Sequence, residues 1–365
     1  MRLKPMMEDL VSPMQSSFIP RRGTHENILI LQEMVHSIRR SRNRDGGMII
    51  KIDHEKAYDK VNWGFLRQTL TFFGFPESLI KLIMCCVMSS QPRVIWNGET
   101  PPSLNPMCGL RQGDPLSLYL FVLCMERLAY LIEEEVDKGA WKPLRVCRGG
   151  PCFSHLFLAY DLIFMARVSF SNVNSIRRVL YQFSHSSGLQ VNMGKSKVFF
   201  SPHLDIEYQQ RLARSLGLVI TRDLGKYLGA PIHHGRVSPS LFRPLIDKIQ
   251  GRLSSWKEKL LDMATRATLI HSVTSAMPTH LMHTAWLPTG TCKHLDKMNR
   301  AFLWARDGNP RKMHTIKWDK ITKDKSKGGL GIKETPNMNI AILAKIGWRI
   351  LIEDKAVWQG VGKCF

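Results

Sequence analysis

The run Ser154-His155-Leu156-Phe157-Leu158-Ala159-Tyr160-Asp161-Leu162-Ile163-Phe164-Met165-Ala166 decides the fold of this chain. Two apolar, aromatic-rich segments flank a short acidic centre, which predicts a strand, a tight turn and a second strand. Asp161 would then stand at the end of a sheet, where its charge can meet a ligand. An aspartate at a hairpin turn is also a common turn former, because its side chain can hydrogen-bond the nearby backbone. The hairpin alone leaves both interpretations open.

A second apolar run also ends in an aspartate. Met48–Ile52 predicts a β-strand, and Asp53 follows it directly. A polar, glycine-bounded loop from Gly109 to Leu116 and an apolar helix from Leu118 to about Glu135 separate this strand from the hairpin. Phosphoryl transfer to a 3′-hydroxyl uses two hard cations about 4 Å apart, bridged by carboxylates from separate elements. Carboxylates at the ends of adjacent strands provide that geometry, so the order of elements resembles a polymerase palm.

The composition favours a polyanionic partner. The 365 residues include 52 lysines and arginines against 30 acidic residues, a formal charge of +22. Such an excess favours nucleic acid first and an anionic membrane second. We find no apolar run approaching the roughly 18–20 residues that span a bilayer, and we predict no membrane contact. No targeting signal is evident, so we expect nuclear or cytoplasmic residence. The eight cysteines form no CxxC pair, which argues against a zinc site.

The last third of the chain is predicted to be largely helical and is basic. Between Lys248 and Lys333 there are 17 lysines and arginines against 6 acidic residues. Tryptophans are interleaved with this charge: Trp256, Trp286, Trp304 and Trp318. Such a pattern suits a nucleic-acid backbone. A folded core with a solvated basic surface would produce the same pattern, so both interpretations stay open.

An ordered set of motifs resembles the reverse transcriptases of LINE-type, non-LTR retrotransposons, particularly the plant L1-like group. Lys51–Asp59 resembles motif A, Gly109–Ser117 resembles motif B, and the hairpin lies where motif C belongs. Five further matches are Gln15–Pro20 (fingers), Ser187–Asn192 with Lys195 (motif D), Tyr227–Pro231, Trp256-Lys257, and Gly328–Ile332. Each motif is moderately specific, and the ordered set, which covers nearly the whole chain, is very specific.

The resemblance implies an α/β (α+β) right-hand polymerase fold. We expect partial fingers over residues 1–47, a palm with an antiparallel sheet and motifs A to D over 48–235, and a mainly helical, basic thumb or connection region over 236–365. The implied activity is RNA-directed DNA polymerisation with two Mg²⁺ ions and dNTPs, on an RNA template with a DNA primer. The resemblance suggests no protein partner.

The resemblance also assigns roles to individual residues. Asp53 would be the principal metal ligand, the backbone carbonyl of His54 a further ligand, and Asp161 the second-rank carboxylate. In the family, the position of Tyr160 holds the aspartate that shares both metals with the motif A carboxylate. A neutral phenol, whose ordinary pKa is near 10, cannot replace an ionised carboxylate. A one-residue slip of the hairpin would invert the facing of every side chain, so a register shift cannot rescue the site.

The remaining assignments concern the nucleotide. Tyr58 would be the steric gate under the incoming sugar, with an ordinary helix-face aromatic as the alternative. Gln112 and Gly113 would pack near the nascent base pair and the sugar. Arg22 and Lys195 are candidates for contacting the triphosphate, and each could equally be a solvated charge.

Other departures from the family agree with decay. Arg21 stands where the fingers loop usually has glycine, and Leu118 where motif B usually continues with proline. We also expect the chain to be truncated at both ends, since it lacks the family's upstream fingers motif, endonuclease domain and Cys/His-rich C-terminal segment. Three hypotheses follow: an active reverse transcriptase, a catalytically silent nucleic-acid-binding relic, or a product without a stable fold. We expect activity to be absent or severely reduced.

Overall fold

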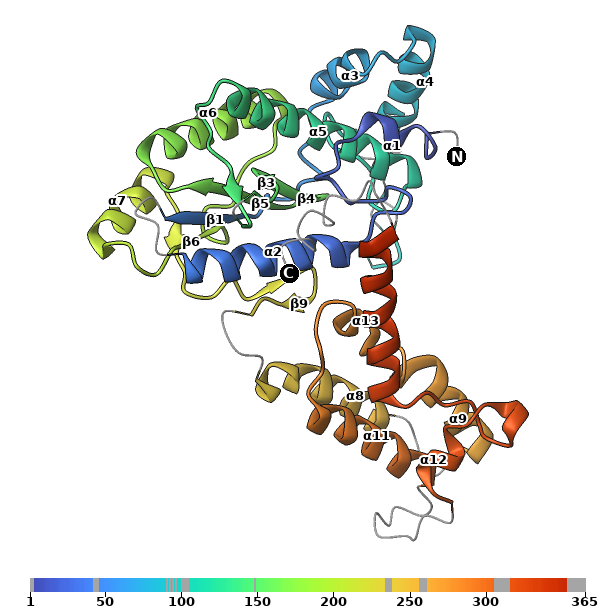
Figure 1. Ribbon diagram of the computed structural model, residues 1–365. Coiled ribbons are helices and arrows are strands. Elements are labelled where there is room, and N and C mark those ends of the chain that lie inside the picture. The colour runs from blue at the N-terminus through green and yellow to red at the C-terminus, as the bar shows by residue number, and fades with distance from the viewer. Residues whose placement is uncertain are drawn as a thin grey trace. The chain divides into compact units, whose positions relative to one another are not determined.

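The computed structural model describes residues 3–41, 46–89, 91, 93, 95, 97–99, 105–147, 149–233, 238–255, 261–304 and 316–352. Trp256 and Lys257 lie outside these ranges. Two compact units divide the chain, the first ending at Leu228 and the second beginning at Gly229 (Figure 1). The three-part division at 47/48 and 235/236 stays a prediction.

The first unit contains seven helices within the described residues: α1 (Met7–Leu10), α2 (Thr24–Arg40), α3 (Trp63–Phe72), α4 (Glu77–Met88), α5 (Pro115–Asp137), α6 (Phe170–Ser187) and α7 (Ile206–Leu216). Its strands are β1 (Gly47–Ile52), β2 (Leu144–Arg145), β3 (Cys152–Phe153), β4 (His155–Leu158), β5 (Asp161–Arg167), β6 (Lys197–Phe200), β7 (Val219–Ile220) and β8 (Lys226–Tyr227).

The central sheet has the strand order β4-β5-β1-β6-β7. Strands β4 and β5 form the hairpin that the sequence predicts, and β5 pairs antiparallel with β1. Helices α6 and α2 lie on opposite sides of this sheet (Figure 1). Only the β6–β7 pair is parallel among the described strands of the sheet, so the predicted antiparallel sheet is mixed at this edge. The α/β palm that the sequence predicts is confirmed.

Side chains on the two sides of β1 explain why helices cover both faces of the central sheet. Met48, Ile50 and Ile52 belong to one buried core with residues of α3, α5 and α6. Lys51 and Asp53 point to the opposite face, because successive side chains of a strand alternate. Helix α2 covers that opposite face. Its N-cap residue is Gly23, which has no side chain to accept a hydrogen bond from the first turn.

Helix α5 is the central helix of this core. Asp114 caps it by accepting from the backbone N–H of Leu116 at 3.1 Å, and Pro115 occupies the first turn, where its missing N–H costs nothing. The helix therefore starts earlier than the Leu118 of our prediction. By length and composition it could also cross a membrane, so the expectation that no run reaches that length is wrong. Its apolar window is 67% buried, as in a core helix of a globular protein.

The second unit begins with β9 (Ala230–Pro231) and is otherwise helical within the described residues. Its elements are η1 (Pro239–Phe242), α8 (Arg243–Ser255), α9 (Met263–Leu269), η3 (Ile270–Thr274), α10 (Thr279–Met282), α11 (Thr289–Trp304), α12 (Trp318–Ile321), η4 (Lys325–Lys327) and α13 (Thr335–Ile352). A separate apolar core, which includes Phe242, Ile270, Leu295 and Phe302, holds them together.

Candidate active site

The sheet register brings the two predicted carboxylates together. Ile52 of β1 pairs with Leu162 of β5, so the next pair along the strands is Asp53 and Asp161. Directly opposed residues lie on the same face with Cβ atoms about 5 Å apart. Burial raises the pKa of Asp161; the nearby ammonium of Lys51 opposes this shift, and the negative charge of Asp53 adds to it. The two side chains therefore form one acidic site beside a lysine.

The backbone of Asp53 is held on both sides by the predicted motif D segment. Its N–H donates to Ser196 Oγ at 3.0 Å, and its carbonyl accepts from the Asn192 N–H at 2.8 Å. The N–H of Glu55 donates to the carbonyl of Gln190 at 3.0 Å in the same arrangement. These bonds fix the backbone from which the Asp53 side chain projects, although Ser196 lies 143 residues later in the chain.

Tyr160 lies in the turn beside this pair. Leu158 pairs with Asp161, which leaves Ala159 and Tyr160 as a two-residue loop. Ala159 has a φ of +52°, a conformation for which glycine is the usual residue in such turns. The Tyr160 side chain is 47% exposed. The register therefore leaves Tyr160, and no carboxylate, at the tip next to Asp161.

The N-terminal loop fixes the outer edge of the hairpin. The N–H of Phe157 donates to the Met14 carbonyl at 2.9 Å, and the Phe157 carbonyl accepts from the Ser16 N–H at 3.1 Å. The same carbonyl accepts from Asn27 Nδ2 at 3.0 Å. Gln15 Oε1 accepts from the Ala159 N–H at the turn itself, at 3.4 Å. This edge is thus paired, and the hairpin cannot slip without breaking several bonds.

The motif B loop packs directly on motif A. The N–H of Leu110 donates to the Tyr58 carbonyl at 2.7 Å, and that of Gly109 donates to the Val61 carbonyl at 2.8 Å. Gly109 has a φ of +92°, and a Cβ there would meet the carbonyl oxygen of Asp59 at 2.7 Å. The position therefore admits only glycine without rearrangement.

Two predicted nucleotide-site residues are placed by these contacts. The Gln112 side chain is exposed and donates from Nε2 to Asp59 Oδ1 at 3.3 Å. The Tyr58 ring stacks on Phe121, with 4.5 Å between centroids and 18° between planes. Burial and the nearby Tyr160 phenol raise the pKa of Tyr58 to about 12. The two phenols are therefore close enough to interact, and Tyr58 stays neutral at neutral pH.

Three other predicted residues have different surroundings. Gly113 is exposed, with a φ of +88° and open space where a Cβ would project. Lys195 is also exposed, in the loop that braces Asp53. The imidazole of His54 is buried, with Nδ1 3.3 Å from the Gln190 carbonyl, and burial lowers its pKa. Its ring is thus a packing group, and the metal role of its backbone carbonyl stays a prediction.

Arg22 is tied to the backbone of the N-terminal segment. Its guanidinium donates to the carbonyls of Ser12, Gln15 and Val11, the last at 3.0 Å. Burial lowers its pKa, and the carboxylate of Glu126 opposes that shift. These bonds favour a structural clamp over either sequence alternative, a triphosphate contact or a solvated charge.

Two residues near the carboxylates were missed in the sequence. Lys51 donates from Nζ to the Lys226 carbonyl at 2.6 Å and interacts with Asp161. Its position two residues before Asp53 on one strand was a usable signal. Tyr227 is fully buried; burial raises its pKa, and Asp161 contributes to that shift. No local pattern indicates that Tyr227 and Asp161 meet, because they lie far apart in the sequence.

The ligand set at this site is small. The described residues contain no group of three His, Cys, Asp or Glu side chains that could hold a metal ion. Asp53 and Asp161 offer two carboxylates, and the residue next to Asp161 in the turn is Tyr160, which carries no carboxylate. Two carboxylates and a backbone carbonyl suit one hard cation better than a bridged pair.

The sheet is mixed, and it carries two opposed carboxylates at the ends of β1 and β5. A glycine-bounded loop packs on the segment that follows β1. This arrangement defines the palm of a nucleic-acid polymerase. A family model of reverse transcriptases (RNA-dependent DNA polymerases) matches residues 1–232. The chain belongs to this family.

Similar proteins agree with this membership. A protein from Xenopus laevis transposon TX1 is 26% identical over 290 residues, covering 76% of this chain and 21% of that protein. The Pol polyprotein of the R2 element of Popillia japonica is 24% identical over 173 residues, covering 47% of this chain and 27% of the polyprotein. An Arabidopsis thaliana protein named as a putative ribonuclease H protein is 38% identical over 128 residues, covering 35% of this chain and 21% of that protein. The chain spans about a fifth to a quarter of these relatives.

A solved structure shares the fold. The telomerase of Candida albicans, in complex with a fragment of telomeric RNA, matches with a TM-score of 0.50 at 12% identity. The match covers 94% of this chain and 50% of the telomerase chain. The predicted resemblance to non-LTR retrotransposon reverse transcriptases and the predicted polymerase fold are both confirmed.

Proposed function

We propose that this palm is the framework of an RNA-directed DNA polymerase whose activity is impaired by Tyr160. The ancestral reaction would extend a DNA primer on an RNA template with dNTPs. The observation that carries the proposal is the register of β1 with β5, which sets Asp53 opposite Asp161. Tyr160 lies next to Asp161, in the turn that joins β4 to β5. Family membership supports the reaction class, and the +22 charge favours nucleic-acid partners.

The cofactor follows from the donor set. Mg²⁺ prefers oxygen ligands, and Asp53, Asp161 and the His54 carbonyl would be its ligands here. A pair of Mg²⁺ ions does not fit these residues, because the carboxylate that would share both ions is absent. A tyrosine hydroxyl is neutral at neutral pH and cannot supply the missing charge. We therefore assign no catalytic step to a second ion.

The other site residues have roles that do not depend on the metal. Tyr58, held rigidly against Phe121, would limit the space beneath the sugar of the incoming nucleotide. Gln112 and Gly113, exposed on the loop that packs on motif A, would face the nucleotide and the nascent pair. Lys195 would approach the triphosphate from the bracing loop. Each of these contacts positions substrate and could persist in a chain that no longer polymerises.

A second function is favoured by the same observations. If Tyr160 abolishes catalysis, the basic chain becomes a nucleic-acid-binding protein without enzymatic activity. Its binding to primer–template would weaken as salt concentration rises, because phosphate contacts release counterions. Both functions predict binding, and they differ in primer extension.

Restoring the aspartate tests the proposal. Primer extension is measured for the native chain, Tyr160→Asp, Tyr160→Phe and Asp53→Ala. We expect Tyr160→Asp to extend primers about a hundredfold faster or more, as for restoring about 3 kcal/mol of transition-state stabilisation. Tyr160→Phe is the matched control, since it keeps the ring and adds no carboxylate, and should stay at the native level.

Two results would contradict the proposal. Native extension equal to that of Tyr160→Asp, and well above Asp53→Ala, would mean that Tyr160 does not impair the site. No gain in Tyr160→Asp, despite primer–template binding equal to that of the native chain, would mean that the hairpin is not the metal-binding turn. A cooperative thermal transition in every variant would exclude misfolding as the cause of any difference in primer extension. It would also argue against the third hypothesis, that the chain has no stable fold.

A further inference from the structure

Lys51 is a cation built into the acidic end of the palm sheet. It lies on β1 two residues before Asp53, so both side chains project from the same face of the chain. Lys51 pairs with Ile163 of β5, and Asp161 lies two residues before Ile163 on that same face. Diagonal neighbours of this kind are about 7 Å apart, a distance that a lysine side chain spans. The register therefore brings the Lys51 side chain within reach of both carboxylates.

The hydrogen bond of Lys51 fixes where its ammonium group lies. Nζ donates to the backbone carbonyl of Lys226 at 2.6 Å. The next residue, Tyr227, is buried, and its phenol interacts electrostatically with Asp161. On the other side of β1, Lys51 is directly opposed by Lys197 of β6. Like charges that are directly opposed repel each other, which favours the Asp161 side of β1, and the ammonium acts on that carboxylate.

The net charge of these three side chains is small. Asp53 and Asp161 contribute two negative charges and Lys51 contributes one positive charge, so the sum is −1 − 1 + 1 = −1. An aspartate in place of Tyr160 would make the sum −2. In this chain Lys51 therefore cancels half of the negative charge that would attract a divalent cation, where it would otherwise cancel a third.

We propose that Lys51 is the internal counter-ion of Asp53 and Asp161, and that it limits the affinity of this site for a divalent cation. Without a metal ion, its ammonium balances the two carboxylates and allows them to lie next to each other. A divalent cation held by the same carboxylates would be repelled by the ammonium. This role rests on the proposed function, because it concerns the one Mg²⁺ ion that the donor set fits, but metal binding tests it without polymerisation.

The experiment measures binding of Mn²⁺ to the full chain by electron paramagnetic resonance of the free ion. Mn²⁺ prefers oxygen ligands, as Mg²⁺ does. Lys51→Met removes the charge and keeps a long side chain. We expect it to bind Mn²⁺ about ten- to a hundredfold more tightly than the native chain, because a doubly charged ion no longer meets an ammonium about 7 Å away. Lys51→Arg keeps the charge and should bind at the native level. A purely structural role of the bond to Lys226 would lower the Mn²⁺ affinity of Lys51→Met or leave it unchanged.

Two other variants of the palm serve as controls. Lys226→Met removes an exposed lysine one position before the buried Tyr227, and successive side chains of a strand point to opposite sides. The loss of that charge should leave the Mn²⁺ affinity at the native level. Asp53→Ala removes the principal ligand and should abolish the binding that Lys51→Met strengthens. A cooperative thermal transition shows that each variant is folded.

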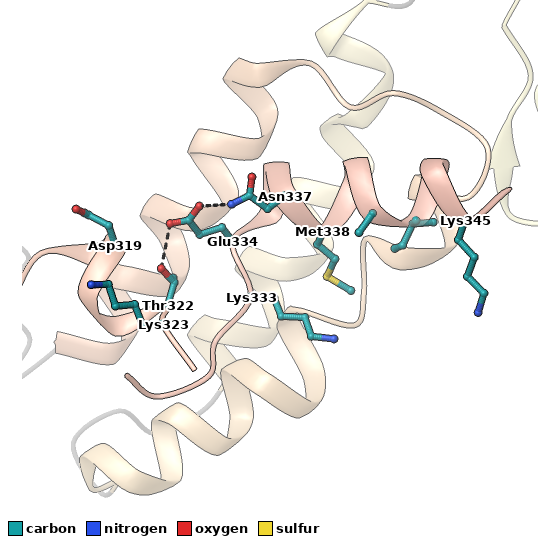
Figure 2. Close-up of a pocket in the computed structure, with 10 residues that line it drawn as sticks. Asp319, Thr322, Lys323, Lys333, Glu334, Asn337, Met338 and Lys345 are labelled. Carbon is teal, nitrogen blue, oxygen red and sulfur yellow. Dashed lines mark hydrogen bonds between the residues drawn. The ribbon is translucent and has the colours of Figure 1, made fainter. Parts of the chain in front are cut away.

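A third control concerns acidic side chains outside the palm. In the second unit, Asp319 and Glu334 line a pocket formed by α12, α13 and the segment between them. Both carboxylate oxygens of Glu334 already accept hydrogen bonds, from Thr322 Oγ1 at 3.0 Å and from Asn337 Nδ2 at 2.7 Å (Figure 2). Glu334→Gln should therefore leave Mn²⁺ binding unchanged.

Several outcomes would overturn the proposal. Equal Mn²⁺ affinities in the native chain and Lys51→Met, or no detectable binding in either, would show that Lys51 does not limit the site. An equal gain in Lys226→Met would show a general effect of net charge. Binding that survives in Asp53→Ala would show that the pair does not hold the ion, and its loss in Glu334→Gln would place the ion in the second unit. If Lys51→Met gains affinity while Tyr160→Asp gains no primer extension, the proposed function fails and the counter-ion role stands.

Discussion

Glu126 makes the stability of the palm depend on pH in a way that one substitution should remove. The side chain lies on α5 and is 1% exposed. Oε1 accepts from the Ser12 N–H at 2.8 Å, while Oε2 has no hydrogen-bond donor among the described residues. Burial raises the pKa of Glu126 to about 7; the bonds from Ser12 and the charge of Arg22 oppose the shift.

The size of the Glu126 contribution to the free energy of unfolding follows from the linkage of protonation to folding. The pKa rises from 4.5 in the unfolded chain to about 7 in the folded one. Each pKa unit corresponds to about 1.36 kcal/mol, so the full effect is about 3 kcal/mol. Because the folded pKa is raised, this stability is fully present below the unfolded pKa and is lost as pH rises through about 7. Glu126→Gln is neutral at every pH and keeps the acceptor for Ser12, so its stability should not show this loss.

The assay must report unfolding of α5 itself, because the chain has two cores. Cys124 is fully buried on the same helix, so its modification by a methanethiosulfonate reagent across a urea series reports the local transition. Modification of Cys124 is followed by peptide mass spectrometry, because Cys85, Cys86, Cys108 and Cys152 are exposed and react in the folded chain. The free energy of unfolding is compared at about pH 5 and about pH 8. Because pH 5 already lies above the unfolded pKa of 4.5, part of the effect has occurred there, and we expect the native chain to lose about 2.5 kcal/mol more than Glu126→Gln between the two pH values.

Glu134→Gln is the matched control. Glu134 lies on the same helix and is exposed, with its carboxylate paired to Lys138 at 2.6 Å. An exposed pair of this kind contributes little to stability, so the control should follow the native pH dependence. If native chain and Glu126→Gln lose equal stability between the two pH values, Glu126 does not carry the burial cost argued above.

Two further substitutions test the packing of each unit. Gly109→Ala should destabilise the palm by about 2 kcal/mol or more, because its Cβ would meet the Asp59 carbonyl at 2.7 Å; Gly113→Ala, also at positive φ but in open space, should cost about 1 kcal/mol. Similar losses in urea unfolding would refute the close packing of motif B on motif A. Asn339→Ala removes the partner of the buried Leu287 N–H and should destabilise the second unit by about 2 kcal/mol. Thermal melts should show no comparable loss for Asn337→Ala, which removes an exposed bond to Glu334.

Local sequence patterns predicted the palm because its key elements are continuous in the chain. The hairpin, the strand before Asp53 and the apolar helix after the Gly109–Leu116 loop can each be recognised within about twenty residues from hydrophobic periodicity and turn residues. The cap at Asp114 was not predicted, and the predicted start at Leu118 was late. The same patterns placed Asp53 and Asp161 at strand ends. Their direct opposition required the register of β1 against β5, which the family resemblance implied and the structure provides.

The supporting contacts could not be predicted, because they join segments that carry no local signal. Ser196 reaches the backbone of Asp53 across 143 positions, and Asn27 reaches Phe157 across 130. Arg22 shows a second difficulty, which is that one position in the sequence is consistent with several roles. A basic residue after a loop is equally consistent with a ligand contact, a solvated charge or a clamp, and only the backbone carbonyls around its guanidinium favour the clamp.

These supporting contacts also distinguish two explanations for a tyrosine at position 160. A decayed catalytic turn could arise from a slipped hairpin or from a single changed residue in an intact frame. Here Leu158 pairs with Asp161, Phe157 is bonded on both its N–H and its carbonyl to the N-terminal loop, and Asp53 is braced from both sides. A slip would break these bonds and invert the buried faces of both strands. The defect that we propose is therefore confined to one side chain at the tip of the turn, which is why a single substitution, Tyr160→Asp, is expected to restore synthesis without rebuilding the palm.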